Sequence, residues 1–518
     1  MHFLCNFWLV LFVVADKTYG VGIFFVVKKS DESLSSSSSE ASFSSSSSEE
    51  ASFSSSSSEE ASFSSSSSEE ASFSSSSSEE ASSSSSEESK ESSGQSDAIQ
   101  LHNWGGNFKF CSQNVEYPRT TAEVQQIVRR SQKLRVFGTR HSFSKIADSC
   151  GTLLSTLGMN SIIAINGSRS TVTVQPGITY TDLAPTLYAN NFALPTLAAI
   201  ADISVAGATQ TCAHGSGLTN SNLATQVRSM RIVLANGTEA SFGPESAELR
   251  AVACGLGAFG VITEVELNLV PTFDTISYNF VSLPTESLYA HFDEMHRMGN
   301  NVLMMTTFAN SSVWDRVTVT VVANSSQHRQ IGNLSNLFGA SLSLAPNPPQ
   351  MVEVNKVQPW YYGLMNIRPG LTGKDGNELQ SEYIMPYKNG VPAIKAVSSL
   401  HQQIQPLLNG FVVRTVKGDD LWLSMSNGDG PMVALHFSWA ESRPTKVNAV
   451  LAQIERILIK FGARPHWGKH FTMKPSEFLK RSNYPHLNEF RKLADKLDPT
   501  HKFRNNFINE NIFESEHF

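Results

Sequence analysis

The sequence predicts an α+β fold with two ordered lobes, preceded by a long polar tail at the N-terminus. Three observations lead to this expectation. A serine- and glutamate-rich repeat ends near residue 97, short strand-like and helix-like runs alternate from residue 98, and longer strands and loops follow Pro271. A chain of 518 residues has room for roughly two to four domains. Two folded lobes and a tail agree with that length.

The first thirty residues resemble a secretion leader. Residues 3–14 are apolar apart from Asn6, which is the length of a signal-peptide core and too short for a membrane span. Asp16 and Lys17 separate this run from a second apolar run at 21–27. We therefore expect a signal peptide and a secreted, extracellular glycoprotein, with a membrane anchor in the secretory pathway as the alternative. Five N-x-S/T sequons agree with this route: Asn166, Asn236, Asn310, Asn324 and Asn333.

Residues 31–97 form the tail. Residues 41–80 contain four copies of a ten-residue unit with one Phe, and such a unit has too little apolar surface to offset the entropy of ordering. We expect this segment to be disordered. It carries a net charge of −14, whereas residues 98–518 carry +5. A charge of +5 is too small to indicate a nucleic-acid partner.

The cysteines leave several alternatives open. Loss of Cys5 with a leader would leave Cys111, Cys150, Cys212 and Cys254, which allow three pairings. No Cys-x-x-Cys is present, so nothing indicates zinc or a dithiol redox pair, and we predict no metal site. In a domain of this size the simplest interpretation is buried free cysteine.

The elements of the first lobe follow from local patterns. Residues 170–175 alternate with period two and end at Pro176-Gly177, which predicts a strand and a turn. Residues 181–190 predict a helix with Thr181 as its N-cap. Further strands are expected at 227–234 and 261–270.

The second lobe has its own pattern. Residues 317–322 and 433–439 predict strands, because both are continuous runs rich in β-branched or aromatic residues. Residues 447–461 predict an amphipathic helix.

Three stretches of the first lobe carry chemistry. The stretch 135–144 predicts an apolar strand that ends at Gly138 and a basic turn that contains Arg140 and His141, a pattern typical of an anion-binding turn. The stretch 203–217 is small, polar and nearly uncharged, which predicts a buried loop around a large ligand with backbone amides as donors. The third, 255–262, has the spacing G-x-G-x-x-G, but a strand follows instead of a helix, so a Rossmann site is excluded.

Together these stretches resemble, in order and spacing, the FAD domain of the vanillyl-alcohol-oxidase type, and most of all the alditol (xylitol) oxidases and related aldonolactone oxidases. The C-terminal part agrees with this resemblance, which covers roughly residues 102–518. The matching motifs there include His436 in Ala-Leu-His-Phe-Ser-Trp, the run Arg464-Pro-His-Trp-Gly-Lys469, Tyr484-Pro485, and Asp498-Pro499.

The resemblance implies a two-lobed architecture. Residues 98–272 would form a PCMH-type FAD-binding domain, and 273–484 a substrate or cap domain with a mixed or antiparallel sheet. Residues 485–518 would return to the FAD domain.

The resemblance also implies the cofactor site. His141 matches the histidine that is bonded to the flavin 8α-methyl group, so FAD would be covalent on His141. Residues 197–200 lack the Cys that bicovalent relatives carry, and Cys212 lies too far along to match it, so a single bond is implied. Other contacts to FAD would come from Gly138, Thr139, Arg140, Ser142, Ser204, Gly207, Thr211, His214, Gly215, Gly260, Val261 and Ile262.

Three residues match family positions before the flavin ring: Arg414, His436 and Lys469. A cation there would stabilise the charge of the reduced ring, and His436 would hold a substrate hydroxyl or help to remove its proton. Two positions depart from the family pattern. Ala199 stands where a substrate-binding Ser is usual, and Val412 stands where a Glu is usual two residues before the arginine. These changes predict a more apolar pocket.

The implied reaction is oxidation of the CH–OH group of a polyol, an alditol, to an aldehyde, with O₂ as acceptor and H₂O₂ as product. The partners would be that polyol, or another sugar-derived substrate, and O₂, without a stable membrane span. One alternative is an aldonolactone oxidase or dehydrogenase on the same fold. An alternative of another class is a secreted, non-catalytic scaffold that binds Ca²⁺ or a mineral surface through the Ser/Glu tail.

Overall fold

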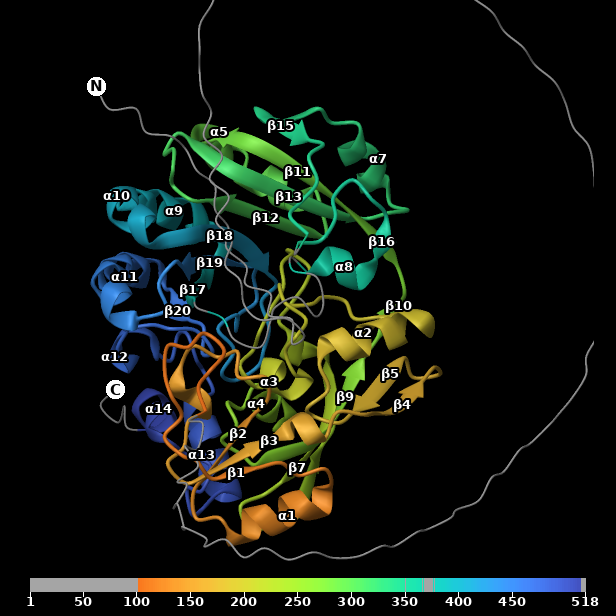
Figure 1. Cartoon of the computed structure of the whole chain (residues 1–518), viewed down its shortest axis with the longest axis vertical. Helices are drawn as coiled ribbons and strands as arrows, with labels where there is room; N and C mark the ends of the chain where they lie inside the picture. The colour runs from red at the N-terminus through yellow and green to blue at the C-terminus, as the bar shows by residue number, and fades with distance from the viewer. Residues whose placement is uncertain (1–100, 350, 366, 368–375, 377, 514–518) are drawn as a thin grey trace, which may run out of the picture. The chain divides into compact units, whose positions relative to one another are not determined.

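The computed structural model describes residues 101–349, 351–365, 367, 376 and 378–513. The expected leader and Ser/Glu tail lie outside these residues. The described part forms one unit with helices and sheets, an α+β fold (Figure 1). None of its helices has the length and apolar composition needed to cross a membrane.

Two sheets of three and five strands, together with a short two-stranded pair, form the described part of the first lobe, before residue 272. A small parallel sheet has the order β1 (Val115–Glu116), β3 (Thr152–Ser155), β2 (Leu134–Phe137). An antiparallel sheet has the order β4 (Ile162–Asn166), β5 (Thr171–Val174), β9 (Val261–Asn268), β7 (Val227–Val233), β8 (Glu239–Phe242). The helices of this lobe are α1 (Thr121–Arg130), α2 (Tyr180–Ala189), α3 (Val205–Gln210) and α4 (Leu249–Val252).

One large antiparallel sheet organises the second lobe. Its described strands run in the order β14 (Asn336–Leu337), β15 (Ala340–Ser343), β11 (Asp274–Pro284), β13 (Val313–Val322), β12 (Asn301–Thr306), β18 (Leu408–Val416), β19 (Met432–Trp439), β17 (Leu379–Pro386), β20 (Arg464–Pro465). A short strand, β16 (Gln358–Pro359), also pairs with β11, and β10 (Val270–Pro271) pairs with β6 (Phe192–Ala193).

Helices accompany this sheet. They are α5 (Thr285–Ala290), α6 (Phe292–Arg297), α7 (Ser326–Gly332), α8 (Trp360–Leu364), α9 (Gly390–Ser398), α10 (His401–Ile404), α11 (Pro444–Leu458) and α12 (Pro475–Phe478). The hydroxyl of Tyr383 on β17 donates to Glu455 of α11 at 2.7 Å, so α11 lies on one face of the sheet at β17. The other face of this strand is therefore available to line a site.

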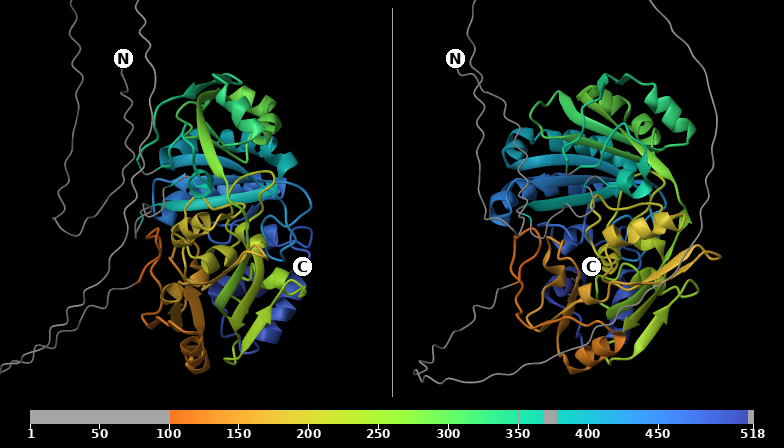
Figure 2. Two further views of the ribbon diagram at one scale, coloured as in Figure 1. Left: turned by 90° about the vertical axis from the view of Figure 1, so that its right-hand side faces the viewer. Right: turned by 45° about the vertical axis from the view of Figure 1, so that its right-hand side comes forward.

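The chain end lies back on the first lobe through α13 (Leu487–Leu497) and α14 (Asn506–Ile508) (Figure 2). The Lys502 ammonium donates to the carbonyl oxygens of Val128 and Ala235, and the Asn505 amide donates to the carbonyl oxygen of Asp148. Buried backbone carbonyls of the first lobe are thus satisfied by side chains from the end of the chain.

Most expected elements are present, with shifted ends. The strand expected at 170–175 is β5, followed by the turn at Pro176-Gly177, and the helix expected at 447–461 is α11 with a short 3₁₀ turn after it. The N-cap of α2 was predicted wrongly. It is Thr179 and not Thr181, because the Thr179 hydroxyl accepts the Asp182 amide at 3.2 Å.

The free-cysteine prediction is also wrong. The structure joins Cys111 to Cys150 and Cys212 to Cys254. Leu256 N–H donates to the Gln210 carbonyl oxygen at 3.2 Å, so the two segments that the Cys212–Cys254 disulfide joins are also hydrogen-bonded to each other. That disulfide therefore joins the stretch 203–217 to the residue that directly precedes the stretch 255–262.

Candidate active site

A cavity of about 380 Å³ lies between the two lobes. Residues of the first lobe line one wall, and the face of β17, β18 and β19 that is turned toward the first lobe lines the other. Most of the predicted site residues line it: Gly138, Thr139, Arg140, His141, Ser142, Ser204, Gly207, Thr211, His214, Gly260, Ile262, Arg414, His436 and Lys469. Gly215 and Val261 do not. Val261 is buried in the core against α1. Gly215 contacts His214 instead, because the Gly215 carbonyl oxygen lies 3.0 Å from His214 Nδ1.

Glycines shape the first-lobe wall. A Cβ atom on Gly138 would lie 2.0 Å from Ser204 Oγ, so only glycine allows the turn after β2 to contact the start of α3. Gly260 has a φ of 154°, and a Cβ there would lie 2.4 Å from the Val233 carbonyl oxygen. Gly207, Gly257 and Gly260 also line the cavity. A wall of this kind fits a large ligand that approaches the backbone closely.

The stretch 203–217 differs from the predicted loop. Residues 205–210 form α3, and Ser204 is its N-cap, because its Oγ accepts the Gly207 amide at 3.3 Å. The small side chains that suggested a loop instead allow this short helix to pack against Gly138. The rest of the stretch, which includes His214, is irregular, as expected.

Arg135 lines the cavity and bonds the segments of the first-lobe wall to one another, and the sequence patterns did not single it out. Its buried guanidinium donates to the carbonyl oxygens of Ile146, Leu256 and Phe503. These bonds join the turn after β2 to the glycine-rich stretch and to the end of the chain. A charged residue inside an apolar strand was the signal that could have identified it.

His141 lies in the turn after β2, with its ring stacked on Trp104 at a centroid distance of 4.8 Å. The preceding residue, Arg140, has a φ of 62°, so the backbone turns sharply before the histidine. Burial, assisted by the positive charge of Lys469, lowers the pKa of His141 to about 3. The ring is therefore neutral at physiological pH and has a lone pair available for bonding.

The second-lobe wall is polar and charged. Successive residues of a strand point to opposite faces, and β17 shows this alternation. Ser381 accepts a hydrogen bond from Trp439 in the core, whereas Gln380 and Glu382 line the cavity. His436 and Ser438 line it from β19.

Three predicted residues meet at the carboxylate of Glu382. Arg414 Nη2 lies 3.1 Å and His214 Nε2 3.4 Å from its Oε1, and His436 Nδ1 lies 3.2 Å from its Oε2. Burial opposes ionisation of Glu382, but the nearby charge of Arg414, with His214 and His436, holds the pKa of Glu382 well below its usual range. Burial lowers the pKa of His436 to about 4.

Lys469 belongs to a second polar group on the same wall. Its ammonium donates to Gln380, Gln380 donates to Glu378, and Ser438 donates to Glu378 at 3.1 Å. Burial lowers the pKa of Lys469 to about 8. The turn of His141 reaches this group, because Phe143 N–H donates to the Gly468 carbonyl at 2.7 Å.

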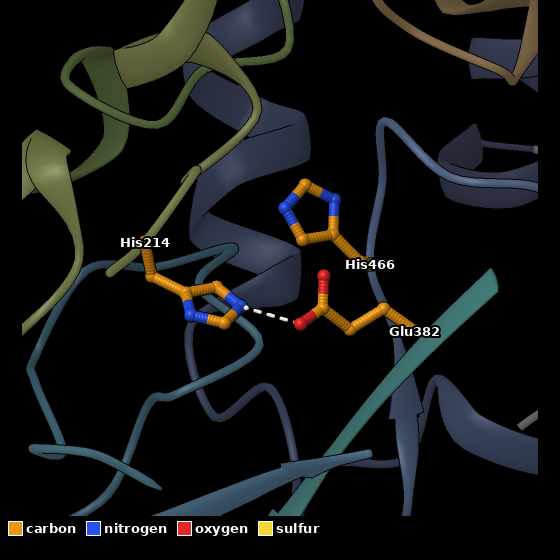
Figure 3. A group of neighbouring side chains, drawn as sticks. All are labelled: His214, Glu382 and His466. Atoms are coloured by element: carbon orange, nitrogen blue, oxygen red, sulfur yellow. Dashed lines mark ion pairs between the residues drawn. The ribbon is translucent and has the colours of Figure 1, made fainter. Parts of the chain in front are cut away.

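Two histidines and Glu382 approach one another closely enough to be considered as a metal group (Figure 3). One ligand atom each from His214, Glu382 and His466 lies within 4.8 Å of the others. Arg414 already pairs with the same carboxylate, and a divalent cation would be repelled by that guanidinium. We therefore assign this cluster as a polar network around the ion pair of Arg414 with Glu382.

Glu382, Gln380 and Glu378 were missed by sequence reasoning. Glu382 lies in a run of otherwise apolar or small residues, Ser-Glu-Tyr-Ile-Met, and a buried glutamate in such a strand requires a charged partner. That signal was present, but the partners lie 32 and 54 residues away in Arg414 and His436, and only the sheet register brings them together. The residues of the first lobe, by contrast, were found because they are neighbours in the sequence.

Comparison with known proteins agrees with the geometry. Residues 112–243 match the family described as FAD binding domain, and residues 377–511 match D-arabinono-1,4-lactone oxidase. An alditol oxidase from a Streptomyces strain is 33% identical over 80% of this chain and 99% of its own length. This chain belongs to the alditol oxidase family.

Other relatives agree with this assignment. A mouse L-gulonolactone oxidase is 27% identical over 80% of this chain and 98% of its own length. The cholesterol oxidase of Brevibacterium sterolicum has the same fold, with a TM-score of 0.64 at 14% identity over 80% of this chain and 96% of that chain. As a member of the alditol oxidase family, the chain is an FAD-dependent oxidoreductase that acts on CH–OH groups.

The cavity fits FAD. Its first-lobe wall offers glycines and backbone groups to a long anionic ligand, and the wall residues from Arg135 to His214 lie within the part of the chain that matches an FAD binding domain. The second-lobe wall would then face the flavin ring and the substrate.

Proposed function

We propose that this protein oxidises a terminal CH–OH group of an alditol to an aldehyde, with O₂ as acceptor and H₂O₂ as product. The observation that carries the proposal is the charged wall of β17, β18 and β19 opposite the glycine-lined wall, in a chain related to an alditol oxidase over most of its length. When bound, FAD supplies the acceptor for the hydride of the carbinol carbon.

The chain's own residues provide the remaining chemistry. His436 is neutral, so it can accept the proton that leaves the substrate hydroxyl. Arg414 and Lys469 place positive charge on the cavity wall, where it stabilises developing negative charge.

Ala199 and Val412 make the substrate end of the cavity less polar. Both residues line it, and neither provides a hydrogen-bonding side chain. We propose that the preferred alditol makes fewer hydroxyl contacts here than in relatives with Ser and Glu at these positions. An aldonolactone is the second candidate substrate, because residues 377–511, which include the charged wall, match a lactone oxidase.

Covalent attachment of FAD to His141 is part of the proposal. The neutral ring, its position in the cavity wall and its stacking on Trp104 support it, because an unprotonated nitrogen held in one orientation would hold the flavin through its 8α-methyl carbon. The methyl group and the imidazole would together lose two protons and two electrons, with O₂ as the oxidant.

A secretory route is also proposed. The sequons support it, because Asn236, Asn310, Asn324 and Asn333 are exposed and Asn166 is half-buried. Treatment of the protein from a eukaryotic host with an endoglycosidase should lower its apparent mass. An unchanged mass would remove this support.

The substrate proposal is tested by mixing the flavin-loaded protein with alditols and with aldonolactones without oxygen, and recording the loss of flavin absorbance. Alditols should bleach the flavin, and readmitted O₂ should restore the colour with release of H₂O₂. Bleaching by lactones alone would favour the second candidate, and no bleaching by either class would contradict both.

A further inference from the structure

The carboxylate of Glu382 connects the two lobes at the centre of the cavity. It accepts from Arg414 of β18, lies beside His436 of β19, and faces His214 of the first lobe. Its side chain is only 2% exposed, so water contributes little to its stabilisation. Its own backbone is fixed as well, because the Glu382 carbonyl oxygen accepts the His466 amide at 2.9 Å.

The sheet register places this carboxylate and the apolar side chain of Val412 on opposite sides of His436. Strand β19 lies between β17 and β18, and His436 pairs with Glu382 on one side and with Val412 on the other. Side chains paired in this way share one face of the sheet. Positions 382 and 412 therefore flank His436 on the cavity wall, and only position 382 has a charge.

We propose that Glu382 is the positioning residue of this site: it orients Arg414 and His436 and supplies the negative charge that Val412 does not. The proposal rests on the proposed function, because the role of both partners is defined by the oxidation of a CH–OH group. Glu382 itself acts through these partners and not on the substrate.

The orientation of His436 follows from the contact. His436 Nδ1 lies 3.2 Å from the ionised Glu382, and this negative charge favours the tautomer with the proton on Nδ1 and the lone pair on Nε2. The substrate hydroxyl proton then passes to Nε2 while the hydride leaves the same carbinol group, and the C–O bond becomes a carbonyl. A ring held in the other tautomer would present N–H to the hydroxyl and could not accept its proton.

His214 extends the same network to the FAD lobe. Its Nδ1 lies 3.0 Å from the Gly215 carbonyl oxygen and its Nε2 lies 3.4 Å from Glu382. Glu382 therefore faces side chains from both lobes at once.

Removal of the Glu382 charge should also affect Lys469. Lys469 interacts with Glu382 and Glu378, which favour its protonated form, and with Arg414, which opposes it. His141, His436 and His466 are its other titratable neighbours. Without the carboxylate, the excess of positive charge should lower the pKa of Lys469 further below about 8.

Glu382→Gln is the direct test. We expect the rate of flavin reduction by an alditol to fall about 10- to 100-fold, as is typical when a group that orients a site residue is lost. The alkaline limb of the rate profile should move to lower pH. The flavin midpoint potential, measured by dithionite titration with a reference dye, should rise, because the uncompensated positive charge favours the anionic reduced flavin.

The double variant Glu382→Gln/Val412→Glu separates positioning from packing. It returns one carboxylate to the other side of His436, so the rate should recover at least about 10-fold and the potential should return toward the wild-type value. Glu455→Gln is the matched control. Glu455 is equally buried and bonds Tyr383 and Thr472 outside the cavity, so its loss should lower stability and leave the potential and the pH profile unchanged.

A Glu382→Gln protein with an unchanged potential and an unchanged alkaline limb would overturn the proposal. So would a loss of rate that the double variant does not recover at all, since that result assigns Glu382 a purely structural role. The flavin midpoint potentials of the wild type and of Glu382→Gln can be measured without a substrate. If the wild type oxidises neither alditols nor lactones, the proposed function fails, and the two potentials still decide the role of Glu382.

Discussion

The two walls of the cavity are built by opposite means. The wall of the FAD lobe consists of three short stretches of neighbouring residues that offer glycines and backbone groups, whereas the wall of the second lobe consists of side chains from β17, β18 and β19 that are far apart in the sequence. Backbone contacts do not depend on side-chain identity, so they suit the cofactor, which is the same whatever the substrate is. Side chains on a sheet can be exchanged one at a time, and Val412 of β18 is an apolar side chain at such a position on the cavity wall.

The largest expected effect is on the charged wall. Arg414→Met should reduce the rate of flavin reduction by roughly 10³-fold, about 4 kcal/mol, because it removes a preorganised positive charge and leaves Glu382 unpaired. Stopped-flow measurement of flavin bleaching gives this rate. Arg316→Met is the control, since Arg316 is an arginine of the same sheet that does not line the cavity. Equal losses in both variants would refute a special role for this wall.

The contrast between the walls also explains what the sequence could reveal. Local motifs predicted the turn after β2, the glycine-rich stretch before β9 and the catalytic candidates Arg414, His436 and Lys469 through a resemblance. Glu382 was missed, because its partners are identified only by the register of β17 with β19 and of β19 with β18. The cysteine pairs were missed for the same reason, since three pairings fit four cysteines equally well until the backbone is known.

The second effect concerns the stability of the FAD-lobe wall. The disulfides Cys212–Cys254 and Cys111–Cys150 span similar separations, 42 and 39 residues, so replacing either pair by serine should lower the free energy of unfolding by about 3 kcal/mol. Denaturant titration measures this loss. Only loss of Cys212–Cys254 should also accelerate release of flavin from a His141→Ala background, because that pair joins two cavity stretches. Equal release from both variants would show that the disulfide does not support this wall.

The third effect is a pH dependence of the charged wall. Burial places the pKa of Lys469 at about 8, so its positive charge is present below that pH and lost above it. The rate of flavin reduction should therefore fall as the pH rises through about 8. Lys469→Arg should abolish this fall of the rate at alkaline pH while the rate below pH 8 stays measurable, because arginine keeps its charge. An alkaline limb that persists in Lys469→Arg would assign it to another group.

The smallest effect concerns the substrate end. Ala199 lines the cavity without a polar side chain. Ala199→Ser should raise kcat/KM for alditols about 5-fold, equivalent to ~1 kcal/mol, through one additional hydrogen bond to a substrate hydroxyl. Steady-state oxygen consumption with a series of alditols measures it, and a matched gain for aldonolactones would show that the position does not select between the two substrate classes.

Acid precipitation of the flavin-loaded protein tests the central claim most directly, because an FAD enzyme with His141 in the cofactor wall should retain its colour. The wild-type precipitate should be yellow, with a flavin spectrum, and a His141→Ala precipitate should be colourless with the flavin released into the supernatant. A wild-type protein that folds, is offered FAD and yields a colourless precipitate and a colourless supernatant would contradict the account. A wild-type precipitate that is colourless over a yellow supernatant would refute the bond to His141 alone.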